Sequence, residues 1–365
     1  MKVKLVTAEF KERLSQLAAV ISKKSPSPVY EHVRLVSDGV SVWLSGVAID
    51  ASLTIKLVKA TVDAPVDVLL PFGRLVDVTN PHTVDELYIA VDKDGTSATL
   101  KGGKATAKLR CFPLESWPEI MERPETETAT LSLGAVKRHV DNVSFAITKK
   151  ESRFATSVSK IESTATSLRF VATDGFCLAF SELPANAGVF NLIIPKTAMD
   201  YVCKLSGEQV KLLVAETGFY FETENEVLTV QRTHGTFPNY NAVLPKSFVQ
   251  TFTVDAATLL GALKRVKPLA DPEIPVITFT TVENATSLLL VAVSAESEGS
   301  DEVDIVAQGP GVEVSLNANI LQPYLERTTG KLTINISDKR SAVDFYAFEG
   351  QYRALIMPVN VAAAK

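Results

Sequence analysis

A unit of about 120 residues recurs three times along this 365-residue chain, and the repeat limits the fold more than any other feature. In each copy an apolar, strand-like run leads into an amphipathic stretch that begins at Thr7, Gly134 or Asp255, which lie 127 and 121 positions apart. Threonine, glycine and aspartate all favour the N-cap of a helix, so we expect each stretch to be helical. The sequence therefore predicts three copies of one strand-and-helix unit.

Two further markers recur with the same period. A short apolar run leads into a second, shorter helix after Pro71, Pro195 and Asn317, spaced by 124 and 122. An apolar residue followed by proline closes each unit at Phe112-Pro113, Phe237-Pro238 and Met357-Pro358, spaced by 125 and 120. Three interleaved series with one period indicate a triplication.

Each unit is predicted to be α+β, with two helices packed on antiparallel sheets. The six predicted helices span 7–24, 72–80, 134–150, 195–206, 255–270 and 317–329. Between them, stretches such as 41–45 and 332–336 alternate apolar with polar residues, which is the period of a half-buried strand.

Two segments refine this plan. Residues 121–128 are polar, contain a proline and have the composition of a linker, so the predicted domains are 1–122, 127–245 and 246–361. Pro323 falls inside the last predicted helix, where a proline is unfavourable. We therefore expect that helix to start near Asn319, with the proline in its first turn or at a kink.

Composition excludes several other architectures. With 46% hydrophobic and 22% charged residues, the chain is typical of a soluble globular protein and not of a disordered or fibrous one. No stretch approaches the roughly 18 apolar residues of a membrane span, and the first residues are not typical of a signal peptide. We expect a cytoplasmic protein without a membrane partner.

Motifs for metal, cofactor or catalytic chemistry are absent from the sequence. The three cysteines and four histidines are scattered and show no zinc-ligand spacing. Cys177 or Ser181 could be paired with His234 as nucleophile and base, but no catalytic signature surrounds them. We expect a non-catalytic protein with no metal and no cofactor.

The charge is unevenly distributed. The whole chain carries −5, but the six predicted helices, 85 residues in all, sum to +8, which leaves −13 on the other 280 residues. Basic helices gathered on one surface would bind phosphates without reading sequence. The alternative is that these side chains lie on ordinary solvated helix faces. The candidate cations are Arg74, Lys137, Arg138, Lys196, Lys204, Lys264 and Arg265.

Three segments resemble a known family. They are VATDGFCLA at 171–179, GTFPNYNAVLP at 235–245 and IMPVNV at 356–361. They are similar to the VATDGHRLA, FPDYRRVLP and MPMRL segments of the bacterial sliding clamp, the β subunit of DNA polymerase III. The resemblance extends over the whole chain in length, order and repeat spacing.

The resemblance implies a fold and a function. It implies three DNA-clamp domains per chain and a homodimer closed head to tail into a ring, with helices lining a central hole. Such a ring would encircle double-stranded DNA without sequence preference and tether the polymerase, raising its effective concentration at the primer end. Expected partners are the DNA polymerase III alpha subunit, the clamp loader and other proteins that carry a clamp-binding motif.

The resemblance also implies site residues. Partners would insert a short motif into a hydrophobic cleft formed by Thr173, Gly175, Phe176, Cys177, Leu178, Pro238, Ala242, Val243, Leu355, Ile356, Met357, Pro358, Val359 and Val361. For DNA it adds Lys24 and Lys150, and for the dimer interface it suggests Leu109 and Leu269.

This sequence departs from the family at the cleft. The family's His-Arg pair is replaced by Phe176-Cys177, its Arg-Arg pair by Asn241-Ala242, and a usual leucine by Thr156. We therefore expect a less basic cleft of a different shape. A second clamp copy with altered partner or inhibitor binding is one alternative, and a β-rich scaffold or binding module that does not bind DNA is another.

Overall fold

The computed structural model describes residues 1–21, 25, 27–147, 158–164, 166–233 and 236–360. The chain divides into two compact units, Met1–Lys137 with Thr197–Thr233, and Arg138–Lys196 with His234–Lys365. These are called unit 1 and unit 2 below. The division falls inside the second predicted domain, and the boundaries predicted from the sequence stay a prediction. No helix in the described ranges is long and apolar enough to cross a membrane.

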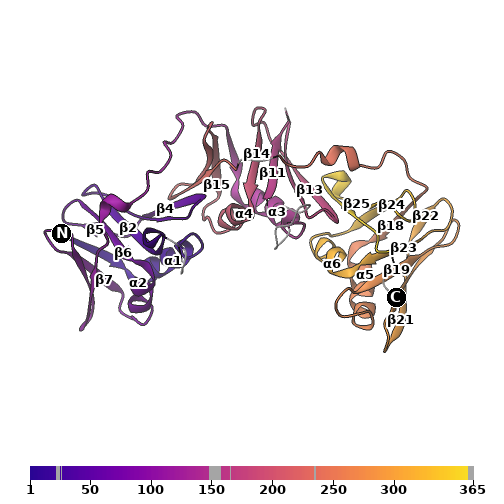
Figure 1. Cartoon of the computed structure of the whole chain (residues 1–365), viewed down its shortest axis with the longest axis horizontal. Coiled ribbons are helices and arrows are strands. Elements are labelled where there is room, and N and C mark those ends of the chain that lie inside the picture. The colour runs from indigo at the N-terminus through magenta and orange to yellow at the C-terminus, as the bar shows by residue number, and fades with distance from the viewer. Residues whose placement is uncertain (22–24, 26, 148–157, 165, 234–235, 361–365) are drawn as a thin grey trace. The chain divides into compact units, whose positions relative to one another are not determined.

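Unit 1 contains two antiparallel sheets (Figure 1). The five-stranded sheet has the order β5 (Thr61–Val62), β1 (Lys2–Val6), β7 (Glu86–Val91), β8 (Ser97–Gly102) and β9 (Ala105–Arg110). The eight-stranded sheet has the order β10 (Ala129–Ser132), β15 (Gln209–Val214), β16 (Gly218–Glu222), β17 (Glu226–Gln231), β4 (Ala51–Leu57), β3 (Val42–Val47), β2 (His32–Ser37) and β6 (Val66–Pro71). The pairing of β4 with β17 joins segments that are far apart in the sequence.

Unit 2 repeats this plan with a nine-stranded and a four-stranded sheet. The larger has the order β14 (Asn191–Pro195), β11 (Val158–Ser163), β12 (Ser167–Thr173), β13 (Cys177–Pro184), β26 (Tyr352–Ile356), β25 (Val343–Ala347), β24 (Lys331–Ile336), β18 (Gln250–Asp255) and β22 (Val306–Gln308). The smaller has the order β21 (Glu298–Asp304), β20 (Ser287–Val293), β19 (Val276–Thr280) and β23 (Glu313–Asn317). Here β13 and β26 join distant segments.

Six α-helices occur among the described residues: α1 (Thr7–Leu17), α2 (Phe72–Thr79), α3 (Leu133–Ser144), α4 (Lys196–Val202), α5 (Ala256–Val266) and α6 (Ala318–Glu326). Short 3₁₀ turns lie at Pro28–Glu31, Leu114–Ser116, Tyr240–Val243, Lys267–Leu269 and Phe348–Gly350. In unit 1, α1 contacts α2, and in unit 2, α5 contacts α6 (Figure 1). The predicted α+β class and the six predicted helices are confirmed.

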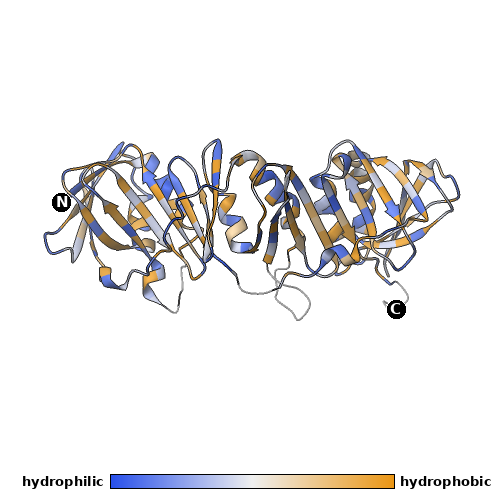
Figure 2. Ribbon diagram, turned by 90° about the horizontal axis from the view of Figure 1, so that it is seen from above, coloured by the Kyte–Doolittle hydropathy of each residue, from blue (hydrophilic) through white to orange (hydrophobic). Residues whose placement is uncertain are grey.

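The strands form because apolar residues alternate along them. Strands β2 and β11 bury every second side chain, and hydrophobic and hydrophilic colours alternate along many strands in Figure 2. One face of each such strand therefore packs into a core while the other meets solvent.

The helix starts were predicted better than their capping. Asp255 caps α5, because its carboxylate accepts a hydrogen bond from Thr258 N at 2.9 Å, and Asn317 caps α6 through Asn319 N at 2.8 Å. Thr7 is instead the first residue of α1, where it is buried, and Gly134 lies inside α3. The expected N-cap roles of these two residues are therefore wrong.

The start of the last helix agrees with the prediction near Asn319, but Pro323 does not lie in its first turn. Helix α6 begins at Ala318, so Pro323 is its sixth residue and lies beyond the first turn. Its carbonyl accepts a hydrogen bond from Arg327 Nη1 at 2.9 Å, which ties the end of the helix to the proline.

The predicted concentration of positive charge within the helices is wrong. Helices α1 and α3 end at Leu17 and Ser144, earlier than predicted. Within the observed bounds the six helices contain eight basic and six acidic residues, a net +2 in place of +8. The remaining cations follow the helix ends, at Lys23, Lys24, Lys149, Lys150, Lys204, Lys267 and Arg327.

Candidate peptide-binding cleft

A cavity of about 230 Å³ opens in unit 2 where β13 pairs with β26. The register of this antiparallel pair places Cys177 opposite Ile356 and Leu178 opposite Leu355. The pairing brings the centre of the sequence and its last strand to one site. The cavity is lined by Thr173, Gly175, Phe176, Cys177, Leu178, Pro238, Asn239, Tyr240, Val243, Ala342, Leu355 and Met357.

The turn between β12 and β13 forms one side of the cleft. The Asp174 carboxylate accepts hydrogen bonds from the backbone N atoms of Phe176 and Cys177, at 2.9 and 2.7 Å. Gly175 has a φ of 89°, a left-handed conformation that favours glycine. This turn holds the Phe176 side chain out of the core with 68% of its surface exposed, so a phenyl ring stands at the cleft mouth.

The last strand and the segment after it form the opposite side. Met357 N donates to Phe176 O at 2.8 Å, which extends the β13–β26 ladder to the tip of the turn. Met357 is 40% exposed and Leu355 is buried. The cleft therefore has a buried apolar floor and an exposed apolar rim.

Tyr240 forms the back wall. It belongs to a buried cluster that comprises Val171, Leu178, Phe180, Phe237, Tyr240 and Leu355. Its ring meets the ring of Phe237 edge to face, with 6.5 Å between centroids. Such aromatic pairs stabilise a packed site beyond the area that they bury.

A network of polar side chains holds the Tyr240 hydroxyl in place. Its hydroxyl donates to Glu162 Oε1 and accepts from Arg169 Nη1 at 3.1 Å. Arg169 Nε donates to Glu182 Oε1 at 2.6 Å. Burial, together with the hydrogen bond to Glu162, raises the pKa of Tyr240 to about 12, so the hydroxyl stays protonated at neutral pH.

The site does not have the geometry of a nucleophilic enzyme. Cys177 is 2% exposed, and burial raises the pKa of its thiol well above the ordinary value, which keeps it unreactive. Ser181 is also buried, and its hydroxyl lies 2.7 Å from His139 Nδ1. Burial lowers the pKa of His139 to about 4, so this pair is a hydrogen bond between two neutral side chains at neutral pH. His234 lies outside the described residues.

Nine of the fourteen predicted cleft residues line the cavity. They are Thr173, Gly175, Phe176, Cys177, Leu178, Pro238, Val243, Leu355 and Met357. Ala242, Pro358 and Val359 do not line it, and Ile356 is fully buried away from it. Val361 and Thr156 lie outside the described residues.

Three lining residues were missed: Asn239, Tyr240 and Ala342. Asn239 and Tyr240 belong to the segment that carried the resemblance, so their positions offered a signal. Ala342 precedes β25, and nothing in the sequence distinguishes it from other small residues.

The residues predicted to contact DNA are distributed over both units. Arg74, Arg138 and Lys204 are exposed, Lys196 is half-buried at the start of α4, and Lys24 and Lys150 lie outside the described residues. Lys264 is exposed and pairs with Glu326 at 3.0 Å. Two further candidates make contacts within the chain. Lys137 Nζ donates to Leu205 O at 2.5 Å, and Arg265 forms an ion pair with Asp301 at 2.6 Å. The DNA-binding roles stay a prediction.

The residues predicted for the dimer interface lie at or beside sheet edges. Leu109 belongs to β9, the edge strand of the five-stranded sheet, and is 9% exposed. Leu269 follows α5 and packs on Gly299 of the edge strand β21, where an added Cβ would lie 2.2 Å from Leu269 Cδ1. Their role in a dimer also stays a prediction.

Comparison with known proteins agrees with this architecture. The family described as DNA polymerase III beta subunit, central domain, matches residues 130–239. The beta sliding clamp of Synechocystis is 24% identical over 390 aligned positions, which cover 99% of this chain and 100% of the relative. The beta sliding clamp of Pseudomonas aeruginosa is 23% identical, over 95% of this chain and 96% of the relative.

Solved structures show the same fold. The DNA polymerase sliding clamp of Bacillus subtilis superposes with a TM-score of 0.93 at 17% identity, over 99% of each chain. The Pseudomonas aeruginosa clamp bound to griselimycin superposes with a TM-score of 0.90 at 22% identity, over 99% of this chain and 100% of the other.

The paired β13–β26 junction, the apolar cleft beside it and the full-length superposition define the fold of a DNA polymerase sliding clamp. Within that class, residues 130–239 match the central domain of the DNA polymerase III beta subunit family, and the whole chain is similar to bacterial beta sliding clamps at 23–24% identity. The resemblance inferred from the three sequence segments is confirmed.

Proposed function

We propose that this chain is a DNA sliding clamp, a processivity factor that encircles duplex DNA and holds the replicative polymerase through its cleft. The observation that carries the proposal is the cleft itself, which retains nine of the predicted lining residues in one cavity of about 230 Å³. The relatives with full-length similarity are named beta sliding clamps. The clamp would act by tethering and not by catalysis.

The cleft suits a short peptide with apolar anchors. Phe176, Val243 and Met357 expose 68%, 62% and 40% of their surface around the cavity. An exposed apolar rim beside a concave apolar floor is typical of a protein-binding site. We propose that the alpha subunit of DNA polymerase III, the clamp loader and other motif-bearing proteins bind here.

The free sheet edges support closure of a homodimer. Strand β9 carries Lys108 and Arg110 with no acidic residue, and β21 carries four acidic residues with no basic one. Both strands lie at a sheet edge, where unpaired backbone groups favour pairing with another strand. Two copies joined head to tail through β9 and β21 would pair opposite charges and satisfy both edges.

DNA contact would be sequence-independent. Exposed cations such as Arg74, Arg138 and Lys204 would meet phosphates, and these contacts position a protein without reading bases. Such contacts let a closed ring slide. The setting of this function would be the cytoplasm, where the bacterial chromosome is replicated.

One observation favours a narrower alternative, a second clamp copy with altered partner or inhibitor binding. Among the described residues no charged side chain lines the cleft, and Phe176 and Cys177, which do line it, stand where the family has histidine and arginine. Such a cleft would favour apolar partners over acidic ones.

Retention on circular DNA tests the clamp function directly. The chain should elute from gel filtration at about twice 39.5 kDa, and after loading it should stay on nicked circular DNA and leave once the DNA is linearised. A β-rich scaffold would show no dependence on DNA topology. Equal retention on circular and linear DNA, or none on either, would contradict the proposal.

Fluorescence polarisation with a labelled pentapeptide that carries leucine and phenylalanine anchors tests the cleft. Saturable binding is expected, together with competition by the unlabelled peptide. Absence of saturable binding would exclude the cleft as the site for the usual motif and would favour the altered-copy alternative.

A further inference from the structure

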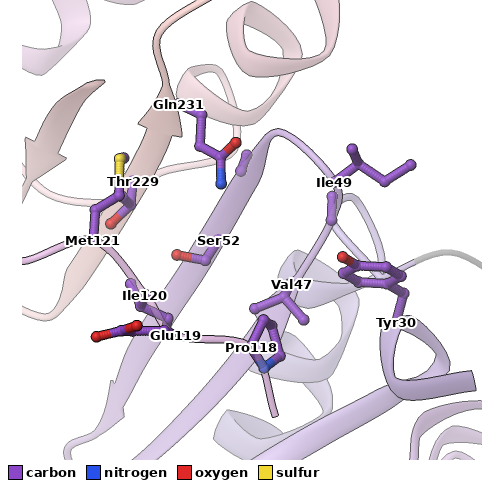
Figure 3. A pocket seen from close by; sticks show the side chains of 12 residues that line it. Tyr30, Val47, Ile49, Ser52, Pro118, Glu119, Ile120, Met121, Thr229 and Gln231 are labelled. Atoms are coloured by element: carbon purple, nitrogen blue, oxygen red, sulfur yellow. The ribbon is translucent and has the colours of Figure 1, made fainter. Parts of the chain in front are cut away.

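Unit 1 contains a groove that is the repeat counterpart of the cleft in unit 2. It has a volume of about 50 Å³ and lies where β4 pairs with β17 (Figure 3). Its walls include Val47, Ile49, Ala51, Ser52, Thr229 and Gln231. Adding 126 to each of these six numbers gives a residue that lines the cleft.

The backbone geometry follows the same offset. Gln231 N donates to Asp50 O at 2.8 Å, as Met357 N donates to Phe176 O at 2.8 Å. In both places a hydrogen bond between two chain segments extends the strand pairing to the tip of a turn. The groove and the cleft therefore share the same backbone arrangement.

The side chains make the groove smaller and more polar than the cleft. Ile49 stands where the cleft has Gly175, and Ser52 stands where it has Leu178. The linker residue Met121 also enters, with its methyl group against Gly218, where an added Cβ would lie 2.5 Å away. Figure 3 shows Ser52 and Gln231 between Ile49 on one side and Glu119, Ile120 and Met121 on the other.

The size and charge of the groove limit what it can hold. A volume of about 10–15 Å³ holds one water, so about 50 Å³ has room for only a few heavy atoms and favours a small aliphatic side chain such as valine over the larger leucine and phenylalanine. Glu119 is the one charged residue in its lining, is exposed, and makes no ion pair with any described residue. A ligand would therefore need a cation next to its aliphatic side chain.

We propose that this groove is a second peptide-docking site, for an extended partner segment in which a valine-sized residue follows an arginine or lysine. The aliphatic side chain would enter between Ser52 and Met121, and the cation would pair with Glu119. The proposal goes beyond the clamp function, because it assigns a separate site with a different ligand preference.

The methionines allow both sites to be followed in the intact chain. The sequence contains four, of which Met121 lines the groove and Met357 lines the cleft, while Met1 and Met199 line neither. A protein with ¹³C-labelled methionine methyls therefore gives one signal for each site and two internal references. Substitution of each methionine by leucine assigns the signals.

The probe is the peptide acetyl-Ala-Arg-Val-Ala-amide, with acetyl-Ala-Glu-Val-Ala-amide as its charge-reversed control. The arginine peptide should shift the Met121 signal saturably and leave Met357 unmoved, and the glutamate peptide should shift neither. Glu119→Gln should weaken binding about two- to fivefold, the effect of losing one exposed ion pair. Glu115→Gln, which changes an exposed acid in the Leu114–Ser116 turn outside the groove, should leave the affinity unchanged.

A Ser52→Leu variant should fill the groove and abolish the shift of the Met121 signal. If this variant does not fold, the comparison of Glu119→Gln with Glu115→Gln tests the proposal. The proposal is overturned if Met121 does not shift at millimolar peptide, or if Glu119→Gln and Glu115→Gln bind alike. A Met357 shift with the leucine-phenylalanine pentapeptide, without a Met121 shift from the arginine peptide, would refute the groove and leave the clamp function standing.

Discussion

Arg353 and Asp344 form a bidentate ion pair between neighbouring strands inside unit 2. Nε and Nη2 of the guanidinium lie 2.7 and 2.9 Å from the two carboxylate oxygens. Asp344 is fully buried and Arg353 is 8% exposed. The guanidinium also lies 5.6 Å from the ring centre of Phe180, a member of the cluster behind the cleft. The pair therefore supports the strand that forms one wall of the site.

Breaking this pair should destabilise the fold strongly. Asp344→Asn leaves a buried guanidinium without its counter-charge, a change that costs about 3–5 kcal/mol of unfolding free energy. The measurement is urea unfolding followed by circular dichroism. Arg34 and Asp67 make the same bidentate contact, at 2.8 and 2.6 Å, but both are partly exposed. Asp67→Asn is therefore the matched control, with an expected loss within about 1 kcal/mol, and an equal loss in both variants would contradict the role of burial.

Removing the phenyl ring at the cleft mouth should weaken peptide binding without weakening the fold. Phe176 is 68% exposed, so Phe176→Ala removes contact area for a partner and little from the core. We expect a loss of about 1–3 kcal/mol in binding free energy by fluorescence polarisation, the range of an aromatic anchor, and an unchanged melting temperature. Val189→Ala, at an even more exposed apolar residue that does not line the cavity, should bind as the wild type does.

The cap of α5 should make stability depend on pH. Hydrogen bonds from the backbone and side chain of Thr258 hold the pKa of Asp255 below its ordinary value. Because the folded pKa is lowered, this contribution is present at neutral pH, begins to fall near the ordinary value of 3.8 and is lost as pH falls through the folded pKa.

Asp255→Ala should therefore cost about 1 kcal/mol at pH 7, and the difference from wild type should shrink below about pH 4. Asp255→Asn should retain most of the stability both at pH 7 and below about pH 4, because asparagine is an equally good cap. Thermal unfolding across this pH range is the measurement. A difference that grows toward acid pH would contradict the assigned sign.

The edge strands should make dimer closure sensitive to charge. Lys108→Glu reverses a charge on β9 that we propose to face the acidic β21, so it should weaken the dimer at low salt. The wild-type dimer should weaken as salt is raised, because exposed charges are screened. Sedimentation velocity gives both results. Lys93→Glu, in an exposed turn of the same unit, is the control, and equal dimer loss in both variants would argue against pairing through β9.

The sequence predicted where helices begin better than where they end. The repeat period and the N-cap at Asp255 indicated where the helices start. The predicted end of the first helix was wrong, because α1 ends at Leu17 and not at Lys24. It ends early because the chain turns to bury Val20 and Ile21, and Ile21 Cγ1 would lie 2.6 Å from a Cβ added at Gly46. That long-range contact leaves no local signal, since neither glycine nor proline follows Leu17 closely.

The candidate cleft was predictable in part for a similar reason. Residues of the turn after β12 carry a recognisable local pattern, so Thr173, Gly175 and Phe176 could be placed in advance. The support of Tyr240 by Glu162 and Arg169 depends on strands that pair across the sheet, and no spacing in the sequence reveals it. The predicted excess of positive charge on the helices was wrong because several of the counted cations lie beyond the observed helix ends.

The pairing of β13 with β26 also sets the order in which the molecule can mature. Residues 177–184 leave the ribosome long before residues 352–356, so through most of translation β13 lacks its later neighbour. During that interval Leu178 has no Leu355 opposite it, and the floor of the cleft is incomplete. The cleft, and the partner binding that we propose for it, therefore require the last strand to be synthesised and paired with β13.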